Sequence, residues 1–79
     1  MFRPSGGQLD AVRVRFSARV ARWVREQHPD CEPQADGKVI VTFRASSMDW
    51  LVRRVLEYGS DAEVVEPEAY REAVRRAVA

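Results

Sequence analysis

Few residues in this chain could do covalent, metal or proton-transfer chemistry. The sequence holds one cysteine, Cys31, one histidine, His28, and no asparagine. A single cysteine excludes an internal disulfide framework, and one histidine beside it leaves too few ligands for a zinc site. Because His28 precedes Pro29 at a predicted helix end, we interpret it as a solvated helix-end residue.

Two pairs of acidic residues have a spacing that general acid–base catalysis could use. They are Asp61 with Glu63, and Glu66 with Glu68. Helix capping and simple solvation explain both pairs without a substrate, and no Ser–His–Asp set or glycine-rich phosphate loop accompanies them. The sequence therefore predicts a protein that is not an enzyme and that binds no metal or cofactor.

Arginine is the prominent chemical group, and it supplies twelve of the thirteen basic side chains. The net charge is only +1, but six arginines against two acids give residues 1–28 a charge of +4. Residues 29–79 have seven basic and ten acidic side chains, a charge of −3. This uneven charge could steer a partner, but it is too weak to indicate a nucleic-acid binder by itself.

The first elements that position these side chains follow from the periodicity of the sequence. Residues 12–16 alternate apolar side chains with arginine, as a half-buried strand does. Ser17 is a suitable N-cap for a helix that ends before Pro29. The predicted apolar face of this helix consists of Val20, Ala21, Trp23 and Val24.

A hairpin and a second helix come next. Proline restricts residues 31–34 to an edge strand, and an Asp-Gly pair then predicts a turn into a strand over residues 39–44. Either Ser46 or Ser47 can cap the following helix, which ends at Gly59. Its predicted apolar stripe consists of Met48, Leu51, Val52, Val55, Leu56 and Tyr58.

A short strand over residues 62–66 and a helix beginning at Pro67 complete the chain. The order β-α-β-β-α-β plus a terminal helix is the split βαβ, or ferredoxin-like, arrangement. We therefore predict an α+β fold with a four-stranded antiparallel sheet, in one domain over residues 10–79 that follows a flexible leader at residues 1–9. The predicted core residues are Val14, Phe16, Val24, Val41, Phe43, Val55 and Val64.

Three known uses of this fold can be tested by residue type. A metal-carrying domain needs a Cys-x-x-Cys loop after the first strand, where this chain has Phe-Ser-Ala-Arg. An acylphosphatase-like enzyme needs a phosphate cradle there and an asparagine, and both are missing. An RNA-recognition motif needs aromatic side chains on the open face of the central strands, where arginine and threonine stand instead.

The open face of the sheet is the candidate binding surface. Arg13, Arg15, Thr42 and Arg44 should lie together there if the strand order is 4-1-3-2. Three guanidiniums could bind an anion or an acidic partner. The alternatives are a solvated face in which Glu63 pairs with the arginines, or a face covered by a neighbouring domain.

A second candidate surface would join two copies of the chain. Trp50 falls on the polar side of its helix, where it can anchor an interface or fold over the sheet edge. Tyr70 and Val74 lie on the apolar stripe of the last helix, beside a predicted edge strand at residues 62–66. We predict a two-fold homodimer through this strand and helix.

Several motifs together resemble the WCX domain, the C-terminal extension of bacterial transcriptional regulators that contain a WYL domain. They are Val12-Arg-Val-Arg-Phe-Ser-Ala-Arg-Val-Ala-Arg-Trp-Val-Arg-Glu26, Asp36-Gly37-Lys-Val-Ile-Val-Thr42, Trp50-Leu51 and Gly59-x-x-Ala62-x-Val64-x-x-Pro67. The resemblance covers residues 10–78. It implies a ferredoxin-like accessory domain that follows a winged helix-turn-helix and a WYL domain, and that is linked to dimerisation and to the response to a nucleic-acid or nucleotide effector.

The chain departs from that pattern because it has no helix-turn-helix and no Trp-Tyr-Leu triplet. Direct DNA binding and the WYL effector site therefore map to no residue here, and we expect either an excised domain or a gene for the extension alone. No apolar run approaches the roughly 18 residues of a membrane helix, so we expect a cytoplasmic protein without membrane contact. The other hypothesis is a stand-alone dimeric ferredoxin-like module that binds a small anionic ligand.

Overall fold

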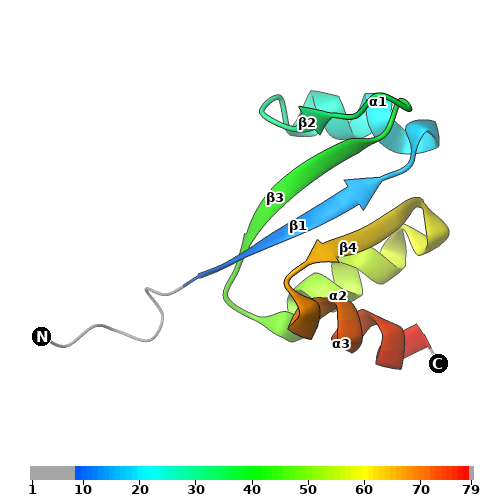
Figure 1. The fold of residues 1–79 in the computed structure, drawn as a ribbon. Helices are drawn as coiled ribbons and strands as arrows, with labels where there is room; N and C mark the ends of the chain where they lie inside the picture. Colours follow the sequence, from blue (N-terminus) through cyan, green and yellow to red (C-terminus); the bar gives the residue numbers. More distant parts are fainter. Residues whose placement is uncertain (1–8, 79) are drawn as a thin grey trace, which may run out of the picture.

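The computed structural model describes residues 9–78. In chain order its elements are β1 (Asp10–Phe16), α1 (Ala18–Gln27), β2 (Glu32–Pro33), β3 (Val39–Ala45), α2 (Met48–Glu57), the 3-10 turn η2 (Gly59–Asp61), β4 (Ala62–Glu66) and α3 (Glu68–Val78). The four strands form one antiparallel sheet in the order β2-β3-β1-β4 (Figure 1). This confirms the predicted α+β fold with a split βαβ order and a C-terminal helix. Of the predicted leader, residues 1–8 lie outside the described residues.

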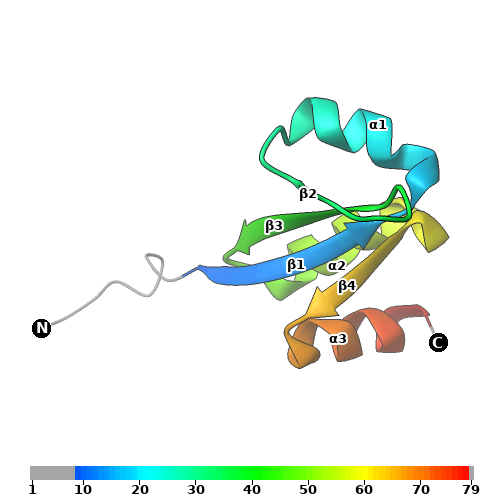
Figure 2. The ribbon, with the colours of Figure 1, turned by 45° about the horizontal axis from the view of Figure 1, so that its top comes forward.

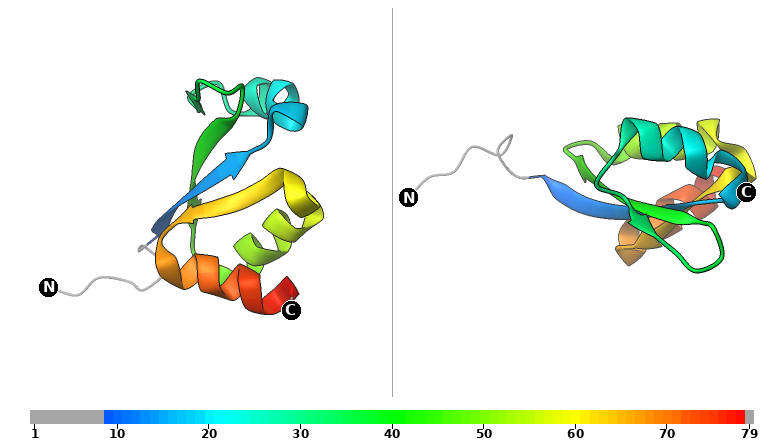
Figure 3. Two further views of the ribbon diagram at one scale, coloured as in Figure 1. Left: turned by 45° about the vertical axis from the view of Figure 1, so that its right-hand side comes forward. Right: turned by 90° about the horizontal axis from the view of Figure 1, so that it is seen from above.

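The two long strands decide which side chains share a face of the sheet. β1 and β3 pair without interruption from Asp10↔Ala45 to Phe16↔Val39. Alternate residues of both strands therefore point to the same side. Both α1 and α2 lie on one face of the sheet, α1 over one end and α2 over the other (Figure 3). α3 runs beside β4 and packs against α2 (Figures 1 and 2).

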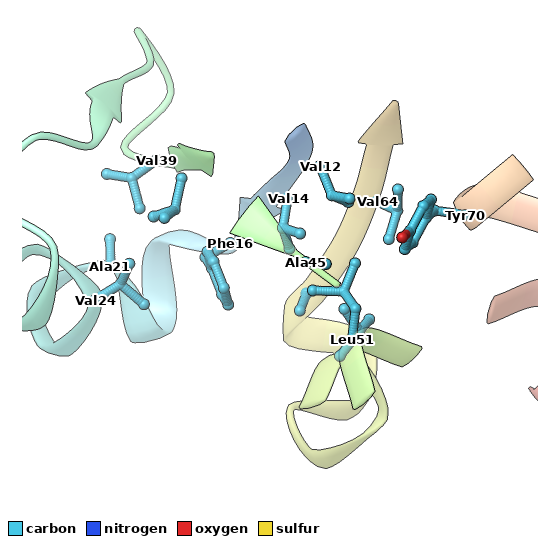
Figure 4. Close-up of a cluster of buried hydrophobic side chains, with 13 residues drawn as sticks. Val12, Val14, Phe16, Ala21, Val24, Val39, Ala45, Leu51, Val64 and Tyr70 are labelled. Atoms are coloured by element: carbon cyan, nitrogen blue, oxygen red, sulfur yellow. The ribbon is translucent and has the colours of Figure 1, made fainter. Parts of the chain in front are cut away.

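The hydrophobic core follows this division of the helices. At the α1 end, Ala21 and Val24 lie near Phe16 and Val39, whereas Leu51 lies at the α2 end (Figure 4). The largest fully buried side chains are Leu51, Val12, Val14, Val24 and Val39. Because both ends belong to one cluster of buried residues, β1 and β3 join the two ends into a single core.

Six of the seven predicted core residues are buried, and the exception is Phe43. Its ring is half-buried and meets His28 edge-on, with ring centroids 5.3 Å apart. The prediction that Trp23 lies on the apolar face of α1 was wrong, because this residue is 63% exposed. Trp23 stands about 100° around the helix from Val24, at the margin of the stripe that Ala21 and Val24 fill.

The turns show which sequence signals act as expected. Ser47 caps α2 by accepting a hydrogen bond from the backbone N–H of Trp50 at 3.2 Å. Ser17 precedes α1 as predicted, but its side chain makes no cap and donates instead to Asp61 Oδ1 at 2.8 Å. Gly37 in the hairpin has φ +88°, a left-handed conformation that favours glycine.

Candidate functional site

The sheet register brings the four predicted binding residues onto one face. Arg13 stands opposite Thr42, and Arg15 stands opposite Ile40. Arg44 lies two residues beyond Thr42 on β3 and therefore on the same side. Thr42 and Arg44 are exposed, whereas both arginines of β1 are half-buried. The four predicted residues therefore lie on the same face of the sheet.

Acidic residues of both outer strands engage Arg13. Its guanidinium donates to Glu32 Oε1 of β2 at 2.7 Å and to Glu66 Oε2 of β4 at 3.2 Å. The hydrogen bond to Glu66 and the nearby charge of Glu32 raise the pKa of Arg13 above its ordinary value. Arg13 thus spans the open face between two strands that are not neighbours and stays charged there.

Arg15 has its own carboxylate partner on β4. Its terminal nitrogen lies 3.2 Å from Glu63 Oε2, as the solvated-face alternative expected. The Nε atom of Arg15 is buried and has no hydrogen-bond partner within residues 9–78. Ile40 has Arg15 and Glu32 as its cross-strand neighbours and is only 6% exposed. The long side chains of these neighbours therefore cover an apolar residue on the open face.

The open face is consequently not a cluster of free cations. Glu32, Glu63 and Glu66 balance the two arginines of β1, so among the arginines of the open face only Arg44 lacks an ion pair within residues 9–78. The sequence analysis considered Glu63 as a partner but missed Glu32 and Glu66. Strict alternation along β4 would put Glu66 on the face of Ala62 and Val64, and a register shift opposite Arg13 and Val14 brings it to Arg13 instead. Finding Glu32 requires the position of β2.

Trp50 contributes to a hollow at the C-terminal end of β3. Arg44, Ser46 and Ser47 line it together with Trp50, around a volume of about 350 Å³. The indole is 48% exposed, so it neither folds away fully over the sheet edge nor projects freely. Arg44 lines this hollow and also belongs to the open face, so the hollow and the open face adjoin and can act as one surface.

The predicted interface residues of α3 occupy different environments. Tyr70 is only 3% exposed, and its hydroxyl donates to Asp10 Oδ2 at 2.8 Å. Figure 4 shows its ring beside Val64 at the inner side of α3. Burial, followed by the hydrogen bond to Asp10, raises the pKa of Tyr70. Tyr70 therefore belongs to the core rather than to the surface, which corrects its expected location.

Val74 does reach a surface, but not the one that Trp50 lines. It is half-buried in a groove of about 380 Å³ between β4 and α3. The other lining residues are Ala62, Glu63, Val64, Arg71, Arg75 and Val78. Trp50 lines the separate hollow at the end of β3, so the structure does not bring the predicted interface residues together.

The acidic pairs that catalysis could have used are each engaged by different cations. Asp61 accepts hydrogen bonds from Arg19 and Ser17, and these bonds hold the pKa of Asp61 below its ordinary value. Glu63 and Glu66 face the arginines of β1, and Glu68 pairs with Arg71 on α3 at 3.1 Å. These carboxylates serve as ion-pair partners and do not converge on a shared space.

Among residues 9–78 no group of three or more His, Cys, Asp or Glu side chains is arranged to hold a metal ion. In the same range no helix has the length and apolar character to cross a membrane.

Comparisons with known proteins identify relatives of this chain. A sequence model of the WCX domain matches residues 9–79. The chain is also similar to Protein PafC from two strains of Mycobacterium tuberculosis, CDC 1551 / Oshkosh and ATCC 25618 / H37Rv. Each is 36% identical over 59 residues, which is 72% of this chain and 19% of that protein. The chain thus spans about a fifth of the length of these curated relatives.

Proposed function

This chain belongs to the WCX domain family, and we propose that it is the non-catalytic regulatory extension of a WYL-type transcriptional regulator. In this role it helps the parent protein to assemble and to respond to a nucleic-acid or nucleotide effector. The observation that carries the proposal is the family match over residues 9–79, which includes every residue that the structure describes. The relatives are about five times as long as the matched segment, which leaves room for the helix-turn-helix and WYL domains.

The geometry supports a docking domain rather than an enzyme or a free anion sensor. The carboxylates of Glu63, Glu66 and Glu68 form ion pairs with separate arginines instead of sharing a reaction site. A stand-alone module for a small anion would need a cationic cluster, and on the open face Glu32, Glu63 and Glu66 neutralise the two arginines of β1. Partner binding is therefore concentrated at Thr42 and Arg44, while Arg13 and Arg15 hold the strands together.

The functional test compares a regulator that contains this chain with the same protein lacking residues 9–79. A gel-shift assay with promoter DNA is run with and without a single-stranded oligonucleotide as the effector. We expect the deletion to preserve basal promoter binding, which the helix-turn-helix supplies, and to abolish the change caused by the oligonucleotide. An equal response of both proteins would refute the regulatory role.

The genomic context gives an independent test of the same proposal. We expect a helix-turn-helix and a WYL domain to be encoded upstream, either in frame with this chain or in an adjacent gene. A locus without either domain would favour the stand-alone ligand-binding module instead.

A homodimer forms the second part of the proposal, through the groove between β4 and α3. Val74 borders this groove, and Val78 at its end is 69% exposed, so pairing would bury apolar surface. Tyr70 contributes no area because its ring is already buried. A two-fold contact would bring each residue of the groove close to its own counterpart.

Analytical ultracentrifugation of charge variants on α3 tests the dimer. Val74→Glu places a carboxylate in the groove, whereas Ala69→Glu makes the same charge change at an exposed position that does not line it. We expect Val74→Glu to be monomeric and Ala69→Glu to dimerise like the original chain. A dimer unaffected by Val74→Glu, or a monomer at every concentration of the original chain, would contradict this interface.

A further inference from the structure

The outer edge of β3 is only partly covered by its neighbouring strand. β3 is seven residues long, but β2 has two residues and pairs only with Ile40 and Val39. Beyond Ile40, Figures 1 and 3 show no strand beside the outer edge of β3. The hydrogen-bonding edge from Thr42 to Arg44 is therefore unpaired within the described residues.

The direction of the backbone groups on this edge follows from the hairpin. The backbone N–H of Gln34 donates to the C=O of Lys38 at 2.8 Å, so Lys38 faces β2. The groups of alternate residues face the same edge of a regular strand, and the β1–β3 register has no shift. The N–H and C=O groups of Thr42 and Arg44 therefore point outward, where no backbone or side-chain partner within residues 9–78 meets them.

The other edges of the sheet are protected in ways that natural proteins commonly use. β2 is short and contains Pro33, which has no N–H to offer a further strand. β4 has a register shift opposite Arg13 and Val14, and α3 runs beside it. An unprotected edge between such protected ones is a feature that β-strand addition can use.

We propose that the Thr42–Arg44 edge binds an extended, acidic segment of another protein by adding it as an antiparallel strand. Its residue opposite Arg44 carries a carboxylate, because Arg44 is the open-face arginine without an ion pair among the described residues. Its next residue lies on the helix-covered face and is apolar, because it meets the half-buried ring of Phe43. The hollow beside Trp50 accommodates the segment where β3 ends.

The surroundings of the edge favour a slender segment over a second copy of this chain. In an antiparallel pair centred on Phe43, residue 45 of a second copy would lie opposite Val41. Its chain beyond that point would run into the space that Glu32 of β2 occupies opposite Ile40. A free peptide segment can leave the edge after three residues, whereas a folded copy must also place its own α2.

The proposal does not depend on the regulator assignment, and it is tested with the chain itself. The probe is the acetylated and amidated peptide Val-Glu-Phe-Thr-Val, titrated into isotope-labelled protein and followed by NMR. We expect saturable shifts and slowed hydrogen exchange at the amides of Thr42 and Arg44. Methylating the Glu and Thr nitrogens of the peptide removes the donors that face β3, and should abolish these effects.

Matched variants separate edge pairing from unspecific contact. Thr42→Pro removes the outward N–H, and proline is tolerated at such an edge position, whereas Thr42→Ala keeps the N–H. We expect Thr42→Pro to weaken peptide binding about tenfold and Thr42→Ala to leave it nearly unchanged. Equal binding by the two variants would overturn the proposal, and the methylated peptide gives the same test if Thr42→Pro does not fold.

A charge exchange tests the acidic character of the segment. Replacing the peptide Glu by Lys should weaken binding about two- to fivefold, and Arg44→Glu should restore the affinity for that Lys peptide. No difference between the two peptides would refute the charge assignment.

A dimer that Thr42→Pro dissociates would make a second copy the occupant. Faster exchange at Thr42 after deletion of residues 1–8 would identify the chain's own N-terminal segment as the occupant. Either result would replace the proposal.

Discussion

Two leucines on α2 offer a stringent test of the fold because they differ mainly in burial. Leu51 is fully buried at the α2 end of the core, whereas Leu56 is 39% exposed and lines a groove against α3. Replacing either by alanine removes three carbon atoms from the same helix. A comparison of the two variants therefore measures the environment rather than the helix propensity.

The structure sets the expected size of each effect. Three buried carbons correspond to about 2.4 kcal/mol of lost transfer free energy, and a cavity raises the cost of Leu51→Ala to about 3–4 kcal/mol. About three-fifths of Leu56 is buried beside an open groove, so Leu56→Ala should cost about 1.4 kcal/mol or less. Because a chain of this size has a free energy of unfolding of about 4–12 kcal/mol, Leu51→Ala should remove at least about a quarter of it.

Urea titration followed by far-ultraviolet circular dichroism is the appropriate assay. Helix loss is a better signal than tryptophan emission, because Trp23 and Trp50 are already largely exposed in the folded chain. We expect the urea midpoint to fall much further for Leu51→Ala than for Leu56→Ala, with similar slopes. Equal losses, or a loss below about 1 kcal/mol for Leu51→Ala, would show that α2 does not pack on the sheet as described.

Three further outcomes can be measured on the same protein. Arg19 holds the pKa of Asp61 below its ordinary 3.8. The stability that the ionised carboxylate contributes is therefore present above pH 3.8 and is lost as the pH falls through the lower native pKa. Asp61→Asn should make the free energy of unfolding less dependent on pH below 3.8. Burial raises the pKa of Tyr70 above its ordinary 10.0, so the stability that its protonated form contributes is present below pH 10.0 and is lost as the pH rises through the native pKa. Tyr70→Phe should remove a step above pH 10.0 from an alkaline absorbance titration, and an unchanged titration would contradict the burial. Acrylamide should quench the emission of Trp23 and of Trp50 in single-tryptophan variants, and strong shielding of Trp23 would place it back on the apolar face of α1.

Local patterns were sufficient to predict the helices and strands and their order along the chain. Alternation in residues 12–16 and 39–44 predicted β1 and β3, and the Asp-Gly pair predicted the turn before β3. Pro33 correctly restricted β2 to an edge. These signals work because side-chain direction in a strand, and φ in a tight turn, depend on neighbours only a few residues away. The same alternation placed Arg13, Arg15, Thr42 and Arg44 on one face.

What those arginines do was decided by tertiary contacts. Arg13 meets Glu32 across 19 residues of sequence and Glu66 across 53, so no local pattern could show that the predicted cationic face is balanced. Tyr70 and Trp23 show the same limit, since periodicity puts both on apolar stripes but only one is buried. A helix stripe says which side turns inward, whereas burial depends on the space that other elements leave. That space, like the unpaired edge of β3 and the partners of each charge, is a property of the assembled sheet.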